Sequence, residues 1–357
     1  MQRRDFLKGT SAAAICAASG GWVAPALAQG LRPLRWGLGV KTVGFIVINT
    51  LIGESLGYNR AEGFTLDARA LGSNSNVQIA LDKGDIDVGV GTPSGLLPLF
   101  AKGEAPPLTY FYEYTYPYKW DISVKPDSAI KRYEDLRGKK IGVSNFGTTD
   151  FPVTKSVLKN LGIDPDKDVT WVAVGEGVPA GVALQRGNID ALAYFDTGFG
   201  AVEATGIEMR YLPRPAQIPY IGGFFQSSRT DWLKANQKLA VGFARSTAKA
   251  SEFILANPEA GARAFLKLYP DAAPKGKSEA EAVKAILYSV NKRMQLFRPY
   301  DKTRKMGYIL ESELKTELEF LGLPPKDLRS IYTNDLIDEI NNFDVEKIRA
   351  EARNYKG

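Results

Sequence analysis

The first half of the chain carries short hydrophobic runs with strand-like spacing, separated by stretches in which hydrophobic residues recur at helical spacing. The runs predict strands at 34–40, 64–70 and 86–90. The stretches predict helices at about 45–56, 76–83 and 93–103. Strands that alternate with helices in this way predict a parallel sheet with right-handed crossovers.

The same pattern returns further along the chain. It predicts strands at 140–143, 169–174 and 189–195 and helices at 150–161 and 179–186. The segments 82–90 and 184–193 are matching units, each with a helix end, a glycine turn, an Ile-Asp pair and a strand. We therefore expect two α/β lobes. A proline-containing connector at 213–219 then leads to a helical C-terminal part.

Polar turns follow the predicted strands. Each contains glycine and most contain Ser, Thr or Asn, at 41–44, 72–76, 91–94, 144–149, 175–177 and 196–198. A single turn of this kind is typical of helix N-capping. Several of them at the carboxyl ends of strands indicate a small-molecule site, because ligands of open α/β sheets bind there. Neither a dinucleotide fingerprint nor a phosphate loop is present.

Aromatic residues occupy every second position from Tyr110 to Trp120. They are Tyr110, Tyr112, Tyr114, Tyr116, Tyr118 and Trp120. In an extended strand they would line one face. That face is either a cross-strand ladder that packs the core or a wall on which a planar ligand stacks. Of the six, we assign Tyr112 and Tyr114 to the ligand.

Composition narrows the chemistry. The chain has 357 residues, of which 24% are charged and 44% hydrophobic, which is typical of a globular protein large enough for two lobes. It has no histidine and a single cysteine, Cys16. A histidine-based triad and a Cys/His zinc site are therefore excluded. The net charge of +6 is dispersed, which argues against a nucleic-acid partner.

The N-terminus has the parts of an export signal. Arg3 and Arg4 precede Phe6-Leu7-Lys8, an uncharged alanine-rich stretch follows, and Ala26-Leu27-Ala28 forms a cleavage pattern. The paired arginines resemble a twin-arginine (Tat) signal, so we expect residues 1–28 to be a signal peptide and the protein to be periplasmic. A membrane anchor is the alternative, but glycine, serine and proline make the stretch weakly apolar.

Several motifs together resemble a known family. They are the unit Gly84–Gly89, the run Asp135–Val143, the unit Gly187–Ala191 and the pair Phe195-Asp196. With the signal-like N-terminus, they resemble the periplasmic solute-binding proteins of ABC importers, of the nitrate/sulfonate/taurine (SsuA/TauA) and NMT1/THI5-like type.

The resemblance implies an α/β protein with the two-lobed periplasmic-binding-protein fold (type II). Each lobe would be a mixed, mostly parallel sheet flanked by helices. Residues 29–120 and 220–357 would form lobe 1 and residues 121–219 lobe 2. The resemblance further implies a monomer that closes on a small-molecule ligand and docks to an ABC permease at the inner membrane, with no catalytic residue, metal or cofactor.

Carried over by position, the resemblance also implies ligand-binding residues. They are Thr42, Ser73, Asn74, Thr92, Ser94, Asn145, Thr148, Glu176 and Asp196. We expect a small organic solute that is planar, aromatic or heteroaromatic, or a small organic anion such as a sulfonate. Glu176 would repel an anion and favours an amine or a ring N–H. Replacing Asp196 or Asn145 with Ala is expected to abolish binding without unfolding the protein.

Two other functions remain open from the sequence. One is an enzyme on the same fold that uses the carboxylates of Glu176 and Asp196, and the other is a sensor module that presents ligand to a membrane receptor. Because no imidazole titrates near neutrality, we also expect ligand affinity to be insensitive to pH between about 6 and 8.

Overall fold

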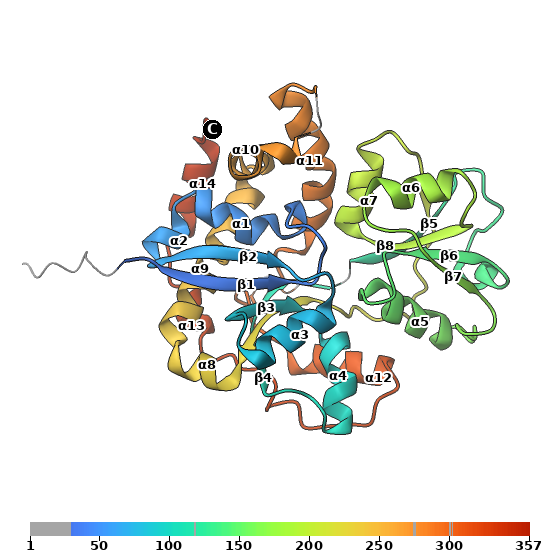
Figure 1. Ribbon diagram of the computed structural model, residues 1–357, viewed down its shortest axis with the longest axis horizontal. Helices are drawn as coiled ribbons and strands as arrows, with labels where there is room; N and C mark the ends of the chain where they lie inside the picture. The colour runs from blue at the N-terminus through green and yellow to red at the C-terminus, as the bar shows by residue number, and fades with distance from the viewer. Residues whose placement is uncertain (1–29, 118, 274–275, 300, 302) are drawn as a thin grey trace, which may run out of the picture. The chain divides into compact units, whose positions relative to one another are not determined.

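The computed structural model describes residues 30–117, 119–273, 276–299, 301 and 303–357. The predicted signal peptide and Tyr118 lie outside the described residues. Within residues 32–357, two mixed five-stranded sheets are each covered by helices on both faces (Figure 1). This arrangement agrees with the predicted α/β class.

Sheet A takes most of its strands from the first part of the chain. In spatial order they are β2 (Phe64–Ala70), β1 (Arg32–Leu38), β3 (Val88–Gly91), β10 (Phe224–Arg229) and β4 (Leu108–Thr115). The first three run parallel, and β10 is antiparallel to both of its neighbours. Strand β10, which comes from far along the chain, thus lies between β3 and β4.

Sheet B repeats this plan. In spatial order its strands are β7 (Thr170–Ala173), β6 (Lys140–Val143), β8 (Ala191–Phe195), β5 (Trp120–Val124) and β9 (Arg210–Tyr211). Strands β6, β7 and β8 are parallel, and β5 is antiparallel to β8 and to β9. The carboxyl ends of the parallel strands and the start of β5 therefore lie along one edge of the sheet.

Helices cover both sheets. Around sheet A they are η1 (Phe45–Val47), α1 (Ile48–Ser55), α2 (Tyr58–Ala61), α3 (Asn74–Lys83), α4 (Pro93–Lys102), α8 (Thr230–Ala235), α9 (Gln237–Ala256), α10 (Pro258–Leu268), η3 (Pro270–Ala272), α11 (Glu279–Arg293), η4 (Met294–Leu296), α12 (Glu311–Phe320), α13 (Ile337–Ile340) and α14 (Val345–Arg353). Around sheet B they are η2 (Tyr133–Leu136), α5 (Asp150–Asn160), α6 (Val178–Gln185) and α7 (Asp196–Glu203). Every strand and helix predicted between 34 and 195 is confirmed, with ends displaced by at most two residues.

The aromatic stretch does not form the single face that its spacing predicts. In the pairing of β4 with β10, Phe111 and Tyr114 have no partner, so the register shifts twice. Each extra residue is a bulge that changes the face on which the following side chains lie. Tyr110 consequently packs on Phe225 in one core, while Phe111, Tyr112 and Tyr114 share the other. The one-face prediction is therefore wrong for this strand.

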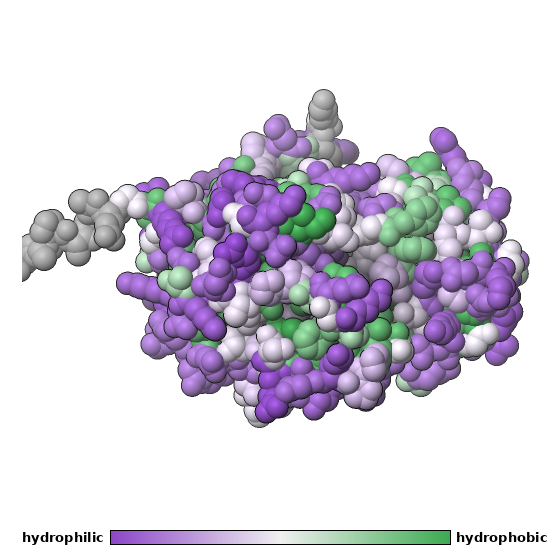
Figure 2. Space-filling view, turned by 60° about the horizontal axis from the view of Figure 1, so that its bottom comes forward, coloured by the Kyte–Doolittle hydropathy of each residue, from purple (hydrophilic) through white to green (hydrophobic). Residues whose placement is uncertain are grey.

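The surface is polar over most of the face seen in Figure 2, with apolar side chains in small separate patches. Six large hydrophobic side chains of the described residues are exposed: Ile79, Phe146, Val178, Tyr220, Tyr288 and Tyr308. None of the helices in the described part of the chain has the length and apolar character needed to cross a membrane.

Helix α11, which belongs to the lobe of sheet A, packs closely against α7, which belongs to the lobe of sheet B (Figure 1). The C-terminal helices therefore contact both lobes. Gly200 of α7 lies directly against the backbone of α11, because a Cβ built on it would come within 2.6 Å of the Ser289 Cα. The Ser289 hydroxyl also donates to the Thr197 carbonyl at 2.9 Å. Glycine at this position is what permits the two helices to approach.

We predict that Gly200→Ala destabilises the protein by about 1–3 kcal/mol, because the added methyl group meets backbone that cannot rotate away. Gly95→Ala is the matched control: it also lies within a helix, but its Cβ would meet only the end of the Gln78 side chain at 3.1 Å. The control should be neutral or stabilising by up to about 1 kcal/mol. Urea unfolding of both variants measures the difference, and equal stability of the two would contradict the prediction.

Candidate functional site

A cavity lies between the two sheets, at the carboxyl ends of their parallel strands. Its walls from the sheet A side are Leu38, Gly39, Val40, Ile46, Val47, Asn74, Val90, Tyr114 and Phe224. Its walls from the sheet B side are Lys119, Trp120, Thr148, Thr149, Asp150, Glu176 and Phe195. The space open to the centre of a water-sized sphere is about 50 Å³, which is room for a few waters or a compact ligand.

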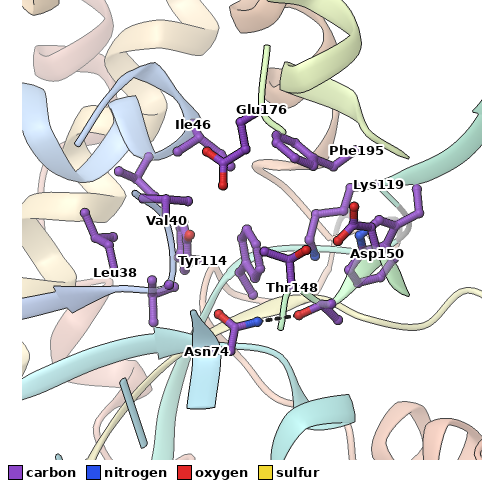
Figure 3. A pocket seen from close by; sticks show the side chains of 16 residues that line it. Leu38, Val40, Ile46, Asn74, Tyr114, Lys119, Thr148, Asp150, Glu176 and Phe195 are labelled. Carbon is purple, nitrogen blue, oxygen red and sulfur yellow. Dashed lines mark hydrogen bonds between the residues drawn. The ribbon is translucent and has the colours of Figure 1, made fainter. Parts of the chain in front are cut away.

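Polar contacts join the two lobes beside this cavity. The Asn74 side-chain amide, at the start of α3, donates to the Thr149 hydroxyl at the start of α5 (Figure 3). The Thr92 hydroxyl lies 3.4 Å from the same oxygen of Thr149. A Cβ on Gly147 would lie 3.4 Å from the Ser73 Cβ. The lobes therefore meet beside the cavity at Thr149, and Gly147 and Ser73 are near neighbours there.

The turn after β6 positions the polar side chains of the cavity wall. The Asn145 carbonyl accepts from the Thr148 hydroxyl at 2.8 Å, and the Asn145 side-chain oxygen accepts from the Gly147 N–H at 2.8 Å. These bonds close the turn and direct the chain into α5. Asp150, the first residue of that helix, accepts from the Ser144 N–H at 2.7 Å. The hydrogen bonds within this turn thus position Thr148, Thr149 and Asp150 at the cavity.

Two carboxylates face the cavity from sheet B. Asp150 is 1% exposed, and its Oδ1 is buried with no hydrogen-bond partner. Burial raises the pKa of Asp150. Glu176 is partly buried in the turn after β7, and burial together with the charge of Asp150 raises the pKa of Glu176. Both groups would be stabilised by a ligand that offers them a hydrogen-bond donor.

A buried cation also lines the cavity. Lys119 is 1% exposed, and its ammonium donates to the Gly222 carbonyl. The nitrogen lies 3.8 Å from the ring centre of Phe224 and 4.2 Å from that of Trp120. Burial lowers the pKa of Lys119 well below its usual value, and the nearby Arg293 acts in the same direction. Among the described residues, no carboxylate forms an ion pair with this lysine.

Aromatic rings form much of the remaining wall. Tyr114 stacks on Phe224, with ring centres 5.8 Å apart and planes 12° from parallel. The Tyr114 hydroxyl is buried and has no hydrogen-bond partner. Phe195 and Glu176 point into the cavity together in Figure 3. The wall therefore offers ring faces and an unused phenol hydroxyl to a ligand.

The structure brings four of the predicted site residues to the cavity: Asn74, Tyr114, Thr148 and Glu176. Three others lie beside it and shape it or join the lobes: Ser73, Thr92 and Asn145. The remaining four are not at the cavity: Thr42, Ser94, Tyr112 and Asp196.

Each of these four has another environment. Thr42 is exposed in the loop after β1. The Ser94 hydroxyl is buried and donates to Glu317 of α12. The bulges of β4 turn the Tyr112 side chain away from the cavity. Its ring packs against Gly307, where an added Cβ would come within 2.1 Å of the ring. Asp196 is held by Arg293, as described below.

Sequence reasoning missed the most charged parts of the cavity. Lys119 occupies one of the positions between the alternating aromatic residues, and nothing in the sequence there marks it as a site residue. Asp150 was read as a helix start, and nothing in its sequence neighbourhood shows that one oxygen is left without a partner. In the described part of the chain, no group of three acidic or cysteine side chains is arranged to hold a metal ion.

The fold defines the class of protein. The structure superposes on the periplasmic aliphatic sulphonate binding protein SsuA from Escherichia coli with a TM-score of 0.61 at 20% identity, covering 82% of this chain and 91% of that one. It superposes on the periplasmic nitrate-binding protein NrtA from Synechocystis PCC 6803 with a TM-score of 0.63 at 13% identity, covering 92% and 99%. The fold is thus the type II periplasmic-binding-protein fold, as predicted.

Comparison of the sequence with known families identifies the family to which the chain belongs. The NMT1/THI5-like family model matches residues 45–261, and the chain belongs to this family. The taurine-binding periplasmic protein of Escherichia coli (strain K12) is 26% identical over 207 residues, which is 57% of this chain and 61% of that protein. The chain therefore matches less than two thirds of this relative's length. The predicted family resemblance is confirmed.

Asp196 has a structural partner that changes the outcome expected for its replacement. It accepts from Arg293 Nε at 2.6 Å and from Nη2 at 2.5 Å, and the Arg293 side chain is fully buried. Arg293 Nη1 also donates to the Ile46 carbonyl at 2.9 Å. Removing the carboxylate would leave a buried guanidinium without its counter-charge.

We predict that Asp196→Ala lowers the free energy of unfolding by about 3–5 kcal/mol, instead of only abolishing binding. The matched control is Asp166→Ala, which removes the partner of Lys155 at a site where the carboxylate is 70% exposed. The control should change stability by less than about 1 kcal/mol. Guanidinium unfolding curves test this, and a stable, cooperatively folding Asp196→Ala protein would show that the pair is dispensable.

The pH-insensitivity expected of ligand affinity stays a prediction, but the stability of the fold has a pH dependence of its own. Asp121 of β5 is mostly buried, and burial raises its pKa to about 6 from an ordinary value of 3.8. A carboxylate therefore titrates at the edge of the neutral range without any histidine. Because the folded-state pKa is the higher one, the group stabilises the fold at low pH, and this contribution is lost as the pH rises through about 6.

We predict that wild type loses roughly 3 kcal/mol of stability relative to Asp121→Asn between pH 4 and pH 7, since the asparagine cannot ionise. Urea unfolding of both proteins across this range measures the difference. A constant difference between the two curves would mean that Asp121 does not titrate with a raised pKa.

Proposed function

We propose that this protein is the substrate-binding component of an ABC importer, which captures a small organic solute in the periplasm and releases it unchanged to a permease. The observation that carries this proposal is the cavity between two lobes, with side chains from both on its walls. The family membership and the names of the relatives, which are binding proteins for taurine, a sulphonate and nitrate, support it.

Capture would proceed by hinge closure. The chain passes between the sheets after β4 and again before β10, close to the boundaries proposed at 120/121 and 219/220. Lys119 and Gly222 lie on these two crossings and are joined by a hydrogen bond. Ligand contacts to both lobes would stabilise the closed arrangement that Asn74 and Thr149 hold in place, and the permease would recognise it.

The walls favour a compact solute with ring or alkyl surface and polar ends. Nine of the sixteen lining residues are aliphatic or aromatic: Leu38, Val40, Ile46, Val47, Val90, Tyr114, Trp120, Phe195 and Phe224. The buried atoms without partners at the cavity, Asp150 Oδ1 and Tyr114 Oη, are groups that a bound solute would satisfy. Such an arrangement supports tight binding and assigns no residue to bond breaking.

We predict that the purified protein binds at least one solute from a panel of aromatic carboxylates, aminopyrimidines, sulfonates and nitrate. A solute at 100 times its dissociation constant should add about 2.7 kcal/mol to the free energy of unfolding. Thermal unfolding identifies the solute, and NMR of the recovered solute shows whether it is unchanged. A chemically altered solute would support the enzyme alternative.

Matched tyrosine variants locate the site. Tyr114→Phe removes the buried, unpartnered hydroxyl of a residue that lines the cavity and should weaken binding roughly 2–10-fold. Tyr112→Phe removes a hydroxyl from a neighbouring buried tyrosine outside the cavity and should leave affinity within twofold. Equal affinity of both variants and wild type would place the solute elsewhere.

A further inference from the structure

The second crossing between the sheets is held at one glycine. Gly222 has a φ of +77°, a conformation that other residues rarely adopt, and a Cβ built on it would overlap the Trp120 ring. The chain therefore lies flat against that ring. Its backbone is bonded on both sides: the Gly222 N–H donates to Glu317 Oε2 at 2.9 Å, and the Gly222 carbonyl accepts from the Lys119 ammonium.

Glu317 extends from a helix that is fixed in the lobe of sheet A. Helix α12 packs beside α4 (Figure 1), and its Leu314 and Leu318 are buried in one cluster with residues of β4. Glu317 is 2% exposed, and its other oxygen, Oε1, accepts from the hydroxyl of Ser94 at the start of α4. The carboxylate thus joins a helix start in the lobe of sheet A to the crossing chain, with one oxygen for each.

The bond to Gly222 affects the cavity, although Glu317 is not on its wall. Gly222 holds the Lys119 ammonium through its carbonyl and lies against the Trp120 ring. Phe224, two residues further along the same crossing, has its ring centre 3.8 Å from the ammonium nitrogen. Lys119, Trp120 and Phe224 all line the cavity. The carboxylate therefore acts on this part of the wall through the glycine.

Three carboxylates act on the charge of the buried lysine at the cavity, and they differ in what they bond. They are Asp196, Glu317 and Glu113. The first is paired with Arg293, and the third is 1% exposed and has no hydrogen-bond partner for either oxygen. Of the three, Glu317 is the one that bonds the crossing at Gly222. Glu113 is therefore a matched comparison, because it is a buried glutamate near the same lysine that does not hold the crossing.

Resting on the proposed hinge closure, we propose that Glu317 is a positioning residue of the binding site: it holds Gly222, and through it Lys119, where the two crossings meet in the closed arrangement. Opening of the lobes turns the backbone of the crossings, so a glycine bonded at both its N–H and its carbonyl favours the closed arrangement over the open one. Glu317 contacts no solute. Its effect is on the fraction of molecules that are closed.

A cross-link between the lobes measures closure without any solute. A Cβ on Gly147 would lie 3.4 Å from the Ser73 Cβ, which is close to the separation of these atoms in a disulfide. The background protein carries Ser73→Cys and Gly147→Cys together with Cys16→Ser, so that these two thiols are the only ones in the chain. The initial rate of disulfide formation with oxidised glutathione then follows the fraction of molecules that are closed.

In this background, Glu317→Met should slow cross-linking roughly threefold or more, because a buried methionine leaves the Gly222 N–H without its charged acceptor. Glu317→Gln keeps an oxygen for Gly222 and should restore the background rate. Glu113→Met is the matched control, and it should leave the rate unchanged. A residue with a merely structural role would lower the stability of the fold and leave the rate in the folded protein as it was.

Urea unfolding of each variant shows that the rates belong to folded protein. If Glu317→Met does not fold, Glu317→Asp takes its place, since aspartate keeps the charge but is one methylene too short to reach both Ser94 and Gly222; it should also slow cross-linking. Equal rates for the Glu317 variants and the background overturn the inference. Equal slowing by Glu317→Met and Glu113→Met overturns it as well.

The outcomes separate this inference from the proposed function, because no solute enters the cross-linking assay. If the Glu317 variants leave the rate unchanged while a solute of the panel above binds, the inference is wrong and the proposed function stands. If no solute of that panel binds but the rates change as expected, the proposed function fails, and the role of Glu317 in holding the lobes together is supported.

Discussion

A fully buried guanidinium joins the parts of this protein that form the cavity. Arg293, at the end of α11, bonds through two nitrogens to Asp196 at the start of α7 and through the third to the Ile46 carbonyl before α1. One side chain thus connects a C-terminal helix, the edge of sheet B and the sheet A side of the cavity. An arginine serves here because its fixed fork satisfies a carboxylate with two donors and leaves a third for a carbonyl.

This connection has consequences for how the lobes can move. The close contact of Gly200 with Ser289 reinforces it, so α7 and α11 are packed as tightly as elements of one core. On the opposite side of the cavity, Thr149 contacts Asn74 and Thr92, and the Asn160 amide of α5 donates to the Phe320 carbonyl of α12 at 3.2 Å. Relative motion of the lobes therefore has to break contacts on both sides of the cavity.

The polarity of the cavity arises from the same organisation. Arg293 takes both oxygens of Asp196, and the buried Lys119 lies near Glu113 and Glu317 with its ammonium bonded to the Gly222 carbonyl. One oxygen of Asp150 is left without a donor at the cavity. A buried acceptor of this kind is unfavourable in the absence of a solute and is satisfied when a solute donates a hydrogen bond to it.

The order of strands and helices, the α/β class and the family could be predicted from the sequence, because these depend on local periodicity and on short motifs such as Asp135–Val143. It also indicated that Asn74, Thr148 and Glu176 follow strand ends, which is why they reach the cavity. The other features of the site depend on how the elements pack. Two bulges in β4 turned Tyr112 into the core and left Tyr114 at the cavity, and the approach of α11 took Asp196 as an ion-pair partner. Lys119 became a site residue because the crossing chains buried it between Trp120 and Phe224. Register shifts and contacts between residues a hundred positions apart have no local signature, because they are set by how whole elements pack.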